Sequence, residues 1–349
     1  MTRLFNIDFL RFLSALGIVY FHLMHKNLLR ATPTSHFYHA LSAANASAYL
    51  LVEFFLIVSG FFMFYTYLKK SNQSLMSYSL QRFFRLWPVM VACVILLSVV
   101  NHTWANEAVA QITLTLCTGL SDSCSSIIWF VAPLFWCGIF LYAILKYARS
   151  LAIPIILILL VASITMTQIF SAQTLDNMNM INSFISFPML RVMMGMSLGI
   201  FVGYLYSRIH TSCVSKNDKI AWGVLEFLCC ALLFYHMFIG AIFKSDIICM
   251  FLFAAIVLLF SIKHGWFSNL LNKSWLGYLG KYSYSIYVVQ QASFDILDKI
   301  FWSSTHYPRS MPVLSLIVSI LFTVLLGILM YYIIERPAMR IGQRLLRRH

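Results

Sequence analysis

Residues 46–68 read ASAYLLVEFFLIVSGFFMFYTYL, a stretch whose one charged side chain is Glu53. An α-helix rises about 1.5 Å per residue, so about 20 apolar residues cross the roughly 30 Å hydrocarbon core of a bilayer. Apolar side chains surround the whole helix rather than one stripe, as expected where lipid or other helices enclose it. The stretch therefore predicts a transmembrane helix.

Similar apolar blocks recur along the whole chain, which is 61% hydrophobic and only 10% charged. Soluble domains carry about a quarter charged residues. The first block carries Arg11 and lacks a small-residue cleavage site, so we expect a helix of the mature protein rather than a signal peptide. We expect an all-α, polytopic bundle of about ten transmembrane helices, forming one domain over residues 1–349 without an appended soluble domain. The blocks lie near residues 7–25, 46–68, 84–101, 126–145, 151–170, 187–206, 220–240, 245–262, 278–297 and 313–334.

The distribution of basic residues explains the net charge of +14 better than nucleic-acid binding does. Eighteen Lys and Arg fall in one alternate set of loops, which includes both termini, and about six fall in the other set. Cytoplasmic loops of membrane proteins carry such an excess. The charge therefore predicts cytoplasmic N- and C-termini, with membrane lipids and not nucleic acid as partners.

Two polar residues interrupt the first block, Arg11 and His22. Eleven helical residues make three turns plus about 20°, so the two side chains share one face about 16 Å apart along the axis. Charged groups within a membrane helix are functional candidates because burying them is costly. They can equally be an interfacial pair, with Arg11 reaching the inner surface and His22 the outer.

Glu53 lies in the outer third of the second block. A carboxylate at this depth needs a cation or a hydrogen-bond donor, and His22 or Arg30 would lie at a similar depth in a hairpin of the first two helices. Gly60 in the same block permits a close helix contact. The alternative is that Glu53 only marks the start of the helix.

Arg82 and Arg85 stand at the predicted cytoplasmic start of the third block, three residues apart. Residues at this spacing share a helix face, so the two guanidinium groups form a clamp suited to phosphate oxygens. The alternative is a pair of interfacial anchors that contact lipid headgroups.

The eight cysteines and ten histidines form no recognisable metal motif, and we predict no metal cofactor. Cys117 and Cys124 both fall in the loop over residues 102–125, which the charge rule places outside. A disulfide can form there in an oxidising periplasm, although two cysteines alone do not decide it.

Five motifs in order resemble the acyltransferase family 3 membrane proteins, which acylate bacterial surface glycans and related acceptors. They extend over nearly the whole chain. They are an Arg-x10-His signature from Arg11 to His22, preceded by Asp8, a segment from Glu53 to Phe61, a segment from Arg82 to Pro88, Gly280 to Tyr287, and Glu335-Arg-Pro337.

The resemblance implies a membrane O-acyltransferase, most often an O-acetyltransferase, that takes an acyl group from a cytoplasmic acyl-CoA. On this interpretation His22 is the general base, Glu53 orients or charges its imidazole, and Arg11 stabilises developing charge or guides the pantetheine arm. Arg82 and Arg85 hold the phosphates of acetyl-CoA.

The implied acceptor is a hydroxyl of a surface glycan, such as O-antigen, or of a lipid-linked sugar, and the implied location is the bacterial inner membrane. The sequence leaves the acceptor, the acyl group, direct transfer versus an acyl-His22 intermediate, and the oligomeric state open. Two features depart from the family pattern. Many relatives carry a His after the Tyr287 motif where this chain has Gln290 and Gln291, and the segment from Trp129 to Trp136 lacks paired glutamates found in longer members.

A different class of protein also fits buried Arg, His and Glu, namely a secondary transporter or exporter of a lipid-linked or acylated compound. Such transporters commonly contain two matching helices broken by Gly or Pro, and no such pair is apparent. Acyl-CoA-dependent labelling of an acceptor distinguishes the enzyme from the transporter.

Overall fold

The computed structural model describes residues 3–28, 47–70, 72–102, 107–118, 127–170, 174–182, 185–209, 216–239, 242–243, 245–299 and 312–347. Within these ranges ten helices coincide with the ten predicted blocks, and the residues form no strand beyond an isolated bridge between Met180 and Ser186. The helices are α1 (Phe5–Leu28), α3 (Leu51–Lys69), α4 (Leu75–Asn101), α6 (Val131–Tyr147), α7 (Ala152–Phe170), α8 (Phe187–Arg208), α9 (Lys216–Phe238), α10 (Asp246–Ile262), α13 (Ser283–Leu297) and α14 (Pro312–Met330).

Seven helices of the described chain are long and apolar enough to cross a membrane. The apolar helices α6 and α10 have 17 residues each, and α13 has 15. The prediction of an all-α, polytopic membrane protein is confirmed.

Two of the predicted boundaries differ from the structure. Helix α4 begins at Leu75, well before residue 84, because Ser74 accepts a hydrogen bond from Ser77 N (3.0 Å) and caps the helix. Arg82 and Arg85 therefore lie inside α4 rather than at its start. The block at 278–297 is divided into α12 (Ser274–Leu279), a 3-10 turn (Gly280–Tyr282) and α13.

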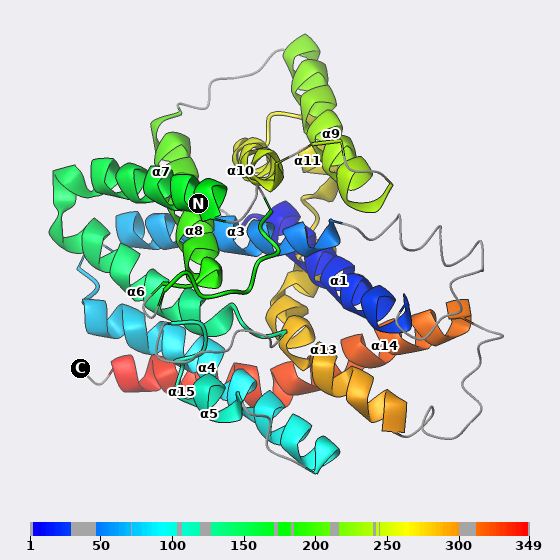
Figure 1. The fold of residues 1–349 in the computed structure, drawn as a ribbon. Helices are drawn as coiled ribbons and strands as arrows, with labels where there is room; N and C mark the ends of the chain where they lie inside the picture. Colours follow the sequence, from blue (N-terminus) through cyan, green and yellow to red (C-terminus); the bar gives the residue numbers. More distant parts are fainter. Residues whose placement is uncertain are drawn as a thin grey trace.

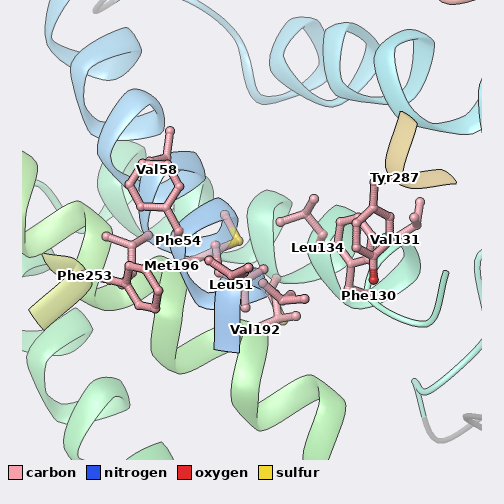
Figure 2. Close-up of a cluster of buried hydrophobic side chains, with 14 of the residues drawn as sticks. Leu51, Phe54, Val58, Phe130, Val131, Leu134, Val192, Met196, Phe253 and Tyr287 are labelled. Carbon is pink, nitrogen blue, oxygen red and sulfur yellow. The ribbon is translucent and has the colours of Figure 1, made fainter. Parts of the chain in front are cut away.

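A row of glycines joins α3 to α8 along their length. Gly195, Gly199 and Gly203 are spaced by four residues on α8, and Gly60 faces them from α3. A Cβ atom on Gly199 would lie 2.0 Å from Ile57 O, so only glycine allows this approach. Small residues at this spacing let membrane helices pack backbone against backbone. Figure 2 shows the resulting core, with Val192 and Met196 of α8 beside Leu51 of α3.

The helices around α1 and α4 form the other half of the bundle. Helix α13 packs against α1, α4 and α14, while α15 (Arg336–Leu346) packs along α4. Figure 1 shows α15 in red beside the cyan α4, with the C-terminus at the end where α4 begins. Gly342 of α15 lies against Phe84, where an added Cβ would come within 2.9 Å of the ring. The C-terminal helix therefore belongs to the bundle and covers the start of α4.

A π-helical turn (Tyr331–Glu335) connects α14 to α15. One extra residue per turn rotates α15 relative to the register of α14 and turns Glu335 inward, where it is buried. Short π-helical segments of this kind are frequent at functional sites.

Candidate active site

A basic vestibule opens between α3, α4 and α15, with a volume of about 690 Å³. Cofactor-sized ligands bind in cavities of about 300–1,000 Å³. The described residues that line it include five cations and no carboxylate. A cavity lined by charges of one sign concentrates ligands of the opposite sign. The cations are Arg11, Lys70, Arg82, Arg85 and Arg347.

A second, smaller cavity of about 70 Å³ adjoins the vestibule, and we call it the channel. The two cavities share lining residues, among them Arg11, Arg82, Phe55 and Ser59. Beyond these shared residues the channel wall is largely apolar, and it is formed by Val52, Leu86, Phe130, Leu134, Tyr284 and Tyr287. The basic mouth is thus suited to an anionic group and the channel to a thin, less polar one.

Four aromatic rings border the channel, and three of them pack together. Phe130 packs edge-on against Tyr287 with ring centroids 4.6 Å apart, and Phe55 contacts the same tyrosine ring at 6.4 Å. Tyr287 Oη donates to Ile127 O (2.9 Å), which fixes its ring. Figure 2 shows Phe130 and Tyr287 in contact, with Leu134 beside them.

Arg82 is held in place by protein groups. Its Nη2 and Nε donate to Leu134 O (2.8 and 3.2 Å), and its Nη1 donates to Tyr78 Oη (3.1 Å). The guanidinium lies over Gly138 of α6, where a Cβ atom would come within 2.6 Å of Nε. Arg82 therefore connects α4 to α6 and presents only its remaining donors to the vestibule.

Arg85 lies on the same face of α4 and is exposed to the vestibule. Its neighbours include Arg11 and Glu335, and Arg11 is 3.5 Å from Asp8 Oδ1. Ser285 Oγ donates to Glu335 Oε2 (2.5 Å), which links the carboxylate to α13. The structure thus gathers residues from all five sequence motifs around the junction of vestibule and channel, including Phe55 and Ser59 from the segment Glu53 to Phe61.

His22 does not line either cavity. Its Nδ1 lies 3.1 Å from Ile18 O, and a carbonyl can only accept, so Nδ1 carries the proton and Nε2 keeps its lone pair. The Gln290 side chain lies beside the ring without a hydrogen bond of regular geometry. His22 is therefore near α13, about 16 Å along α1 from Arg11.

The predicted pairing of Glu53 with His22 is wrong. Arg191 of α8 donates to Glu53 Oε1 from its Nε, and the side chains of Glu53 and Arg191 are 0% and 3% exposed. The glycine contact between α3 and α8 explains this partner, because it turns the Glu53 side of α3 toward α8 rather than α1. Arg30 and Cys124 lie outside the described residues.

Further hydrogen bonds hold the ion pair. Arg191 Nη1 donates to Leu175 O (2.9 Å) and Nη2 donates to Tyr49 O (3.0 Å), while its guanidinium carbon lies 5.1 Å from the Trp129 ring centroid. This pattern of contacts indicates a structural connection between the start of α3 and the segment before α8.

Sequence reasoning missed Arg191 and the positions of Ser285 and Gln290. For Arg191 a signal was present. An Arg and a Glu that each stand alone in an apolar block are natural partners for one another, because neither is stable in the membrane unpaired.

A family profile described as an acyltransferase domain matches residues 4–332. No curated protein matches the chain. No solved structure matches it either. The profile includes four of the five motifs, and the Glu335-Arg-Pro337 motif follows just beyond it. Since the match extends over nearly the whole sequence, this chain belongs to acyltransferase family 3 and is a membrane acyltransferase.

Proposed function

We propose that the protein is an O-acetyltransferase of the bacterial inner membrane, which moves the acetyl group of cytoplasmic acetyl-CoA to a hydroxyl of a surface glycan or lipid-linked sugar. The observation that carries the proposal is the vestibule with five cations and no carboxylate among its described lining, which shares part of its wall with the channel. Acetyl-CoA has the matching form, with three phosphates at one end and a thin pantetheine arm ending in a small thioester at the other.

The vestibule fits the nucleotide end of the donor. Guanidinium groups bind phosphate oxygens through several parallel hydrogen bonds, and Arg85 is exposed to the cavity. Lys70 and Arg347 are exposed at the mouth and add positive charge there. Arg11 stands where the vestibule narrows, so its role is to guide the arm into the channel.

His22 is the proposed general base. Its Nε2 accepts the proton of the acceptor hydroxyl as the oxygen attacks the thioester carbon, and the same proton then passes to the departing thiolate. The products are the acyl ester and free CoA. The role proposed for Glu53 changes accordingly, because its partner is Arg191: it holds α3 and α8 in place and does not contact the base.

The decisive experiment uses the purified protein in lipid nanodiscs and membranes from cells that produce it. Wild-type membranes should transfer label from [14C]acetyl-CoA to lipid or glycan, and His22→Ala should abolish transfer while calorimetry shows unchanged CoA binding. His25→Ala, an exposed histidine one turn along the same helix, is the matched control and should stay active. Transfer by His22→Ala at the wild-type rate would exclude His22 as the base, and a wild-type protein that neither binds CoA nor transfers label would refute the proposed function.

A further inference from the structure

The face of α13 that packs on α1 carries one polar side chain among apolar ones. Ile286, Gln290 and Phe294 recur every four residues and so lie on one stripe of the helix. Ile286 and Phe294 pack with Val19 and Leu23 of α1, the residues on either side of His22. The Gln290 amide therefore lies at the same height along α1 as the His22 imidazole.

This amide forms no hydrogen bond of regular geometry with the described residues, and the His22 ring lies beside it. Gln290 is 0% exposed, and both Oε1 and Nε2 are buried without a hydrogen bond. The next residue behaves differently, because Gln291 Nε2 donates to the Asp295 carboxylate (3.2 Å). Native proteins pair nearly all buried polar atoms with hydrogen-bond partners, because an unpaired one is costly. An unpaired amide therefore points to a ligand that supplies the missing partner. An apolar residue at position 290 would pack with Ile286 and Phe294 and leave no buried polar atom without a hydrogen bond.

The position of this amide on α13 relates it to the channel wall. Tyr287, which lines the channel, precedes Gln290 by three residues on α13, so the two side chains lie on neighbouring parts of one face. Three helical residues rise about 4.5 Å, so Gln290 lies within about one turn of the channel wall at Tyr287, and His22 lies beside it. His22 offers the Nε2 lone pair there, since Nδ1 is bonded to Ile18 O.

We infer that Gln290 binds the acceptor hydroxyl, an inference that rests on the proposed acyltransferase function. The hydroxyl oxygen accepts from the Gln290 amide N–H and directs its own proton to His22 Nε2. Attack forms the bond from this oxygen to the acyl carbon and breaks the carbon–sulfur bond. The proton held by His22 leaves with the thiolate, so the step requires no further reactant.

The test replaces the amide by an apolar side chain of similar length. Gln290→Met, with Gln290→Leu as a second apolar variant, is compared with Gln291→Met, which changes the same residue type one position away. The measurements are the thermal midpoint, CoA affinity by calorimetry, and the pH–rate profile of [14C]acetyl transfer in membranes. Both Gln290 variants should fold as well as wild type and bind CoA normally, yet transfer about 100-fold more slowly, as when one aligned hydrogen-bond donor is removed from an active site. The shape of the pH profile should not change, because the base is intact, and Gln291→Met should keep the wild-type rate.

Three results would overturn the inference. Transfer at the wild-type rate would show that the amide only fills space, and unfolding of both apolar variants would show that it is needed for packing. A shifted pH profile would show that Gln290 acts on the His22 imidazole and not on the acceptor. A wild-type membrane with no more transfer than His22→Ala would instead be a failure of the proposed function itself, so the two failures are distinguishable.

Discussion

Glu53 pairs with Arg191 in a buried ion pair, whereas the sequence motif indicates that Glu53 acts on the His22 imidazole. We predict that Glu53→Gln destabilises the protein by about 3–5 kcal/mol, because it leaves Arg191 buried without its counter-charge. Thermal unfolding in detergent measures the loss, and the variant should unfold at a lower temperature than the wild-type protein. The double variant Glu53→Leu with Arg191→Met should lose less stability than either single change, since apolar replacements of both partners are often tolerated.

A fully stable Glu53→Gln variant with no turnover would contradict this prediction. Such a result would show that the Glu53 carboxylate takes part in the reaction, as its position in the sequence motif indicates.

Arg82 and Arg85 should respond differently to substitution by lysine, although they share one motif. Arg85→Lys keeps the charge but loses the fork of donors directed to the vestibule, so CoA affinity should fall about 10- to 100-fold, as expected for a lost hydrogen bond to a charged group. Arg82→Lys should chiefly lower stability, because the Leu134 O and Tyr78 Oη bonds connect helices α4 and α6.

Calorimetry with CoA and thermal unfolding measure the two effects. Arg340→Lys, an exposed arginine of α15 outside the vestibule lining, is the control and should alter neither quantity. Equal loss of CoA affinity in both lysine variants would show that Arg82 binds the donor as Arg85 does.

Phe130 limits the space at the inner part of the channel, where it packs on Tyr287. We predict that Phe130→Ala shifts donor preference from acetyl-CoA toward butyryl-CoA, because removing the ring leaves room for a longer chain. Competition between the two labelled donors measures the shift. Phe140→Ala, on the exposed face of the helix α6 that begins just after Phe130, should leave the preference unchanged. An unchanged preference in both variants would place the acyl group elsewhere.

At the scale of elements, the contact between α3 and α8 depends on glycine. Gly199→Ala places a Cβ 2.0 Å from a backbone carbonyl, which cannot move away without separating the helices, so folded yield should fall sharply. Gly203→Ala meets the Phe64 side chain at 3.1 Å, which can shift, and should be milder. Fluorescence-detected chromatography of the two variants gives the comparison, and equal yields would show that this helix contact is not close-packed.

The sequence predicted the helices well and their junctions poorly. Long apolar runs are local signals, so every predicted block contains a helix. The early start of α4 depends on one hydroxyl at Ser74, and the inward turn of Glu335 depends on a π-helical turn. Such features arise from single hydrogen bonds and helix packing, which hydropathy does not record.

At the scale of the whole molecule, the charge rule assigns a side to each helix end. We predict that Asn179→Cys, in the segment before α8, is labelled by an impermeant maleimide in intact cells, whereas Asn72→Cys, between α3 and α4, is labelled only after lysis. Both asparagines are exposed, so reactivity reports the side of the membrane. The opposite pattern would invert the topology and place the vestibule outside.

The sequence predicts that motifs far apart in the chain act together, but it does not predict how they are arranged around the site. Arg11, Arg85 and Glu335 come from helices at opposite ends of the chain and meet only through the packing of α1, α4 and α15. His22 was correctly placed in α1, yet its neighbour Gln290 depends on the rotation of α13, which no local pattern determines.

The unbroken positive charge of the vestibule also has a metabolic consequence. On the proposed function, its cations bind the CoA phosphates, which the reaction leaves unchanged, so spent CoA should be held nearly as firmly as acetyl-CoA. On the proposed function, turnover then follows the cytoplasmic ratio of acetyl-CoA to CoA rather than the amount of acetyl-CoA alone. A cell short of carbon would slow the decoration of its surface through product competition, without any separate regulatory site.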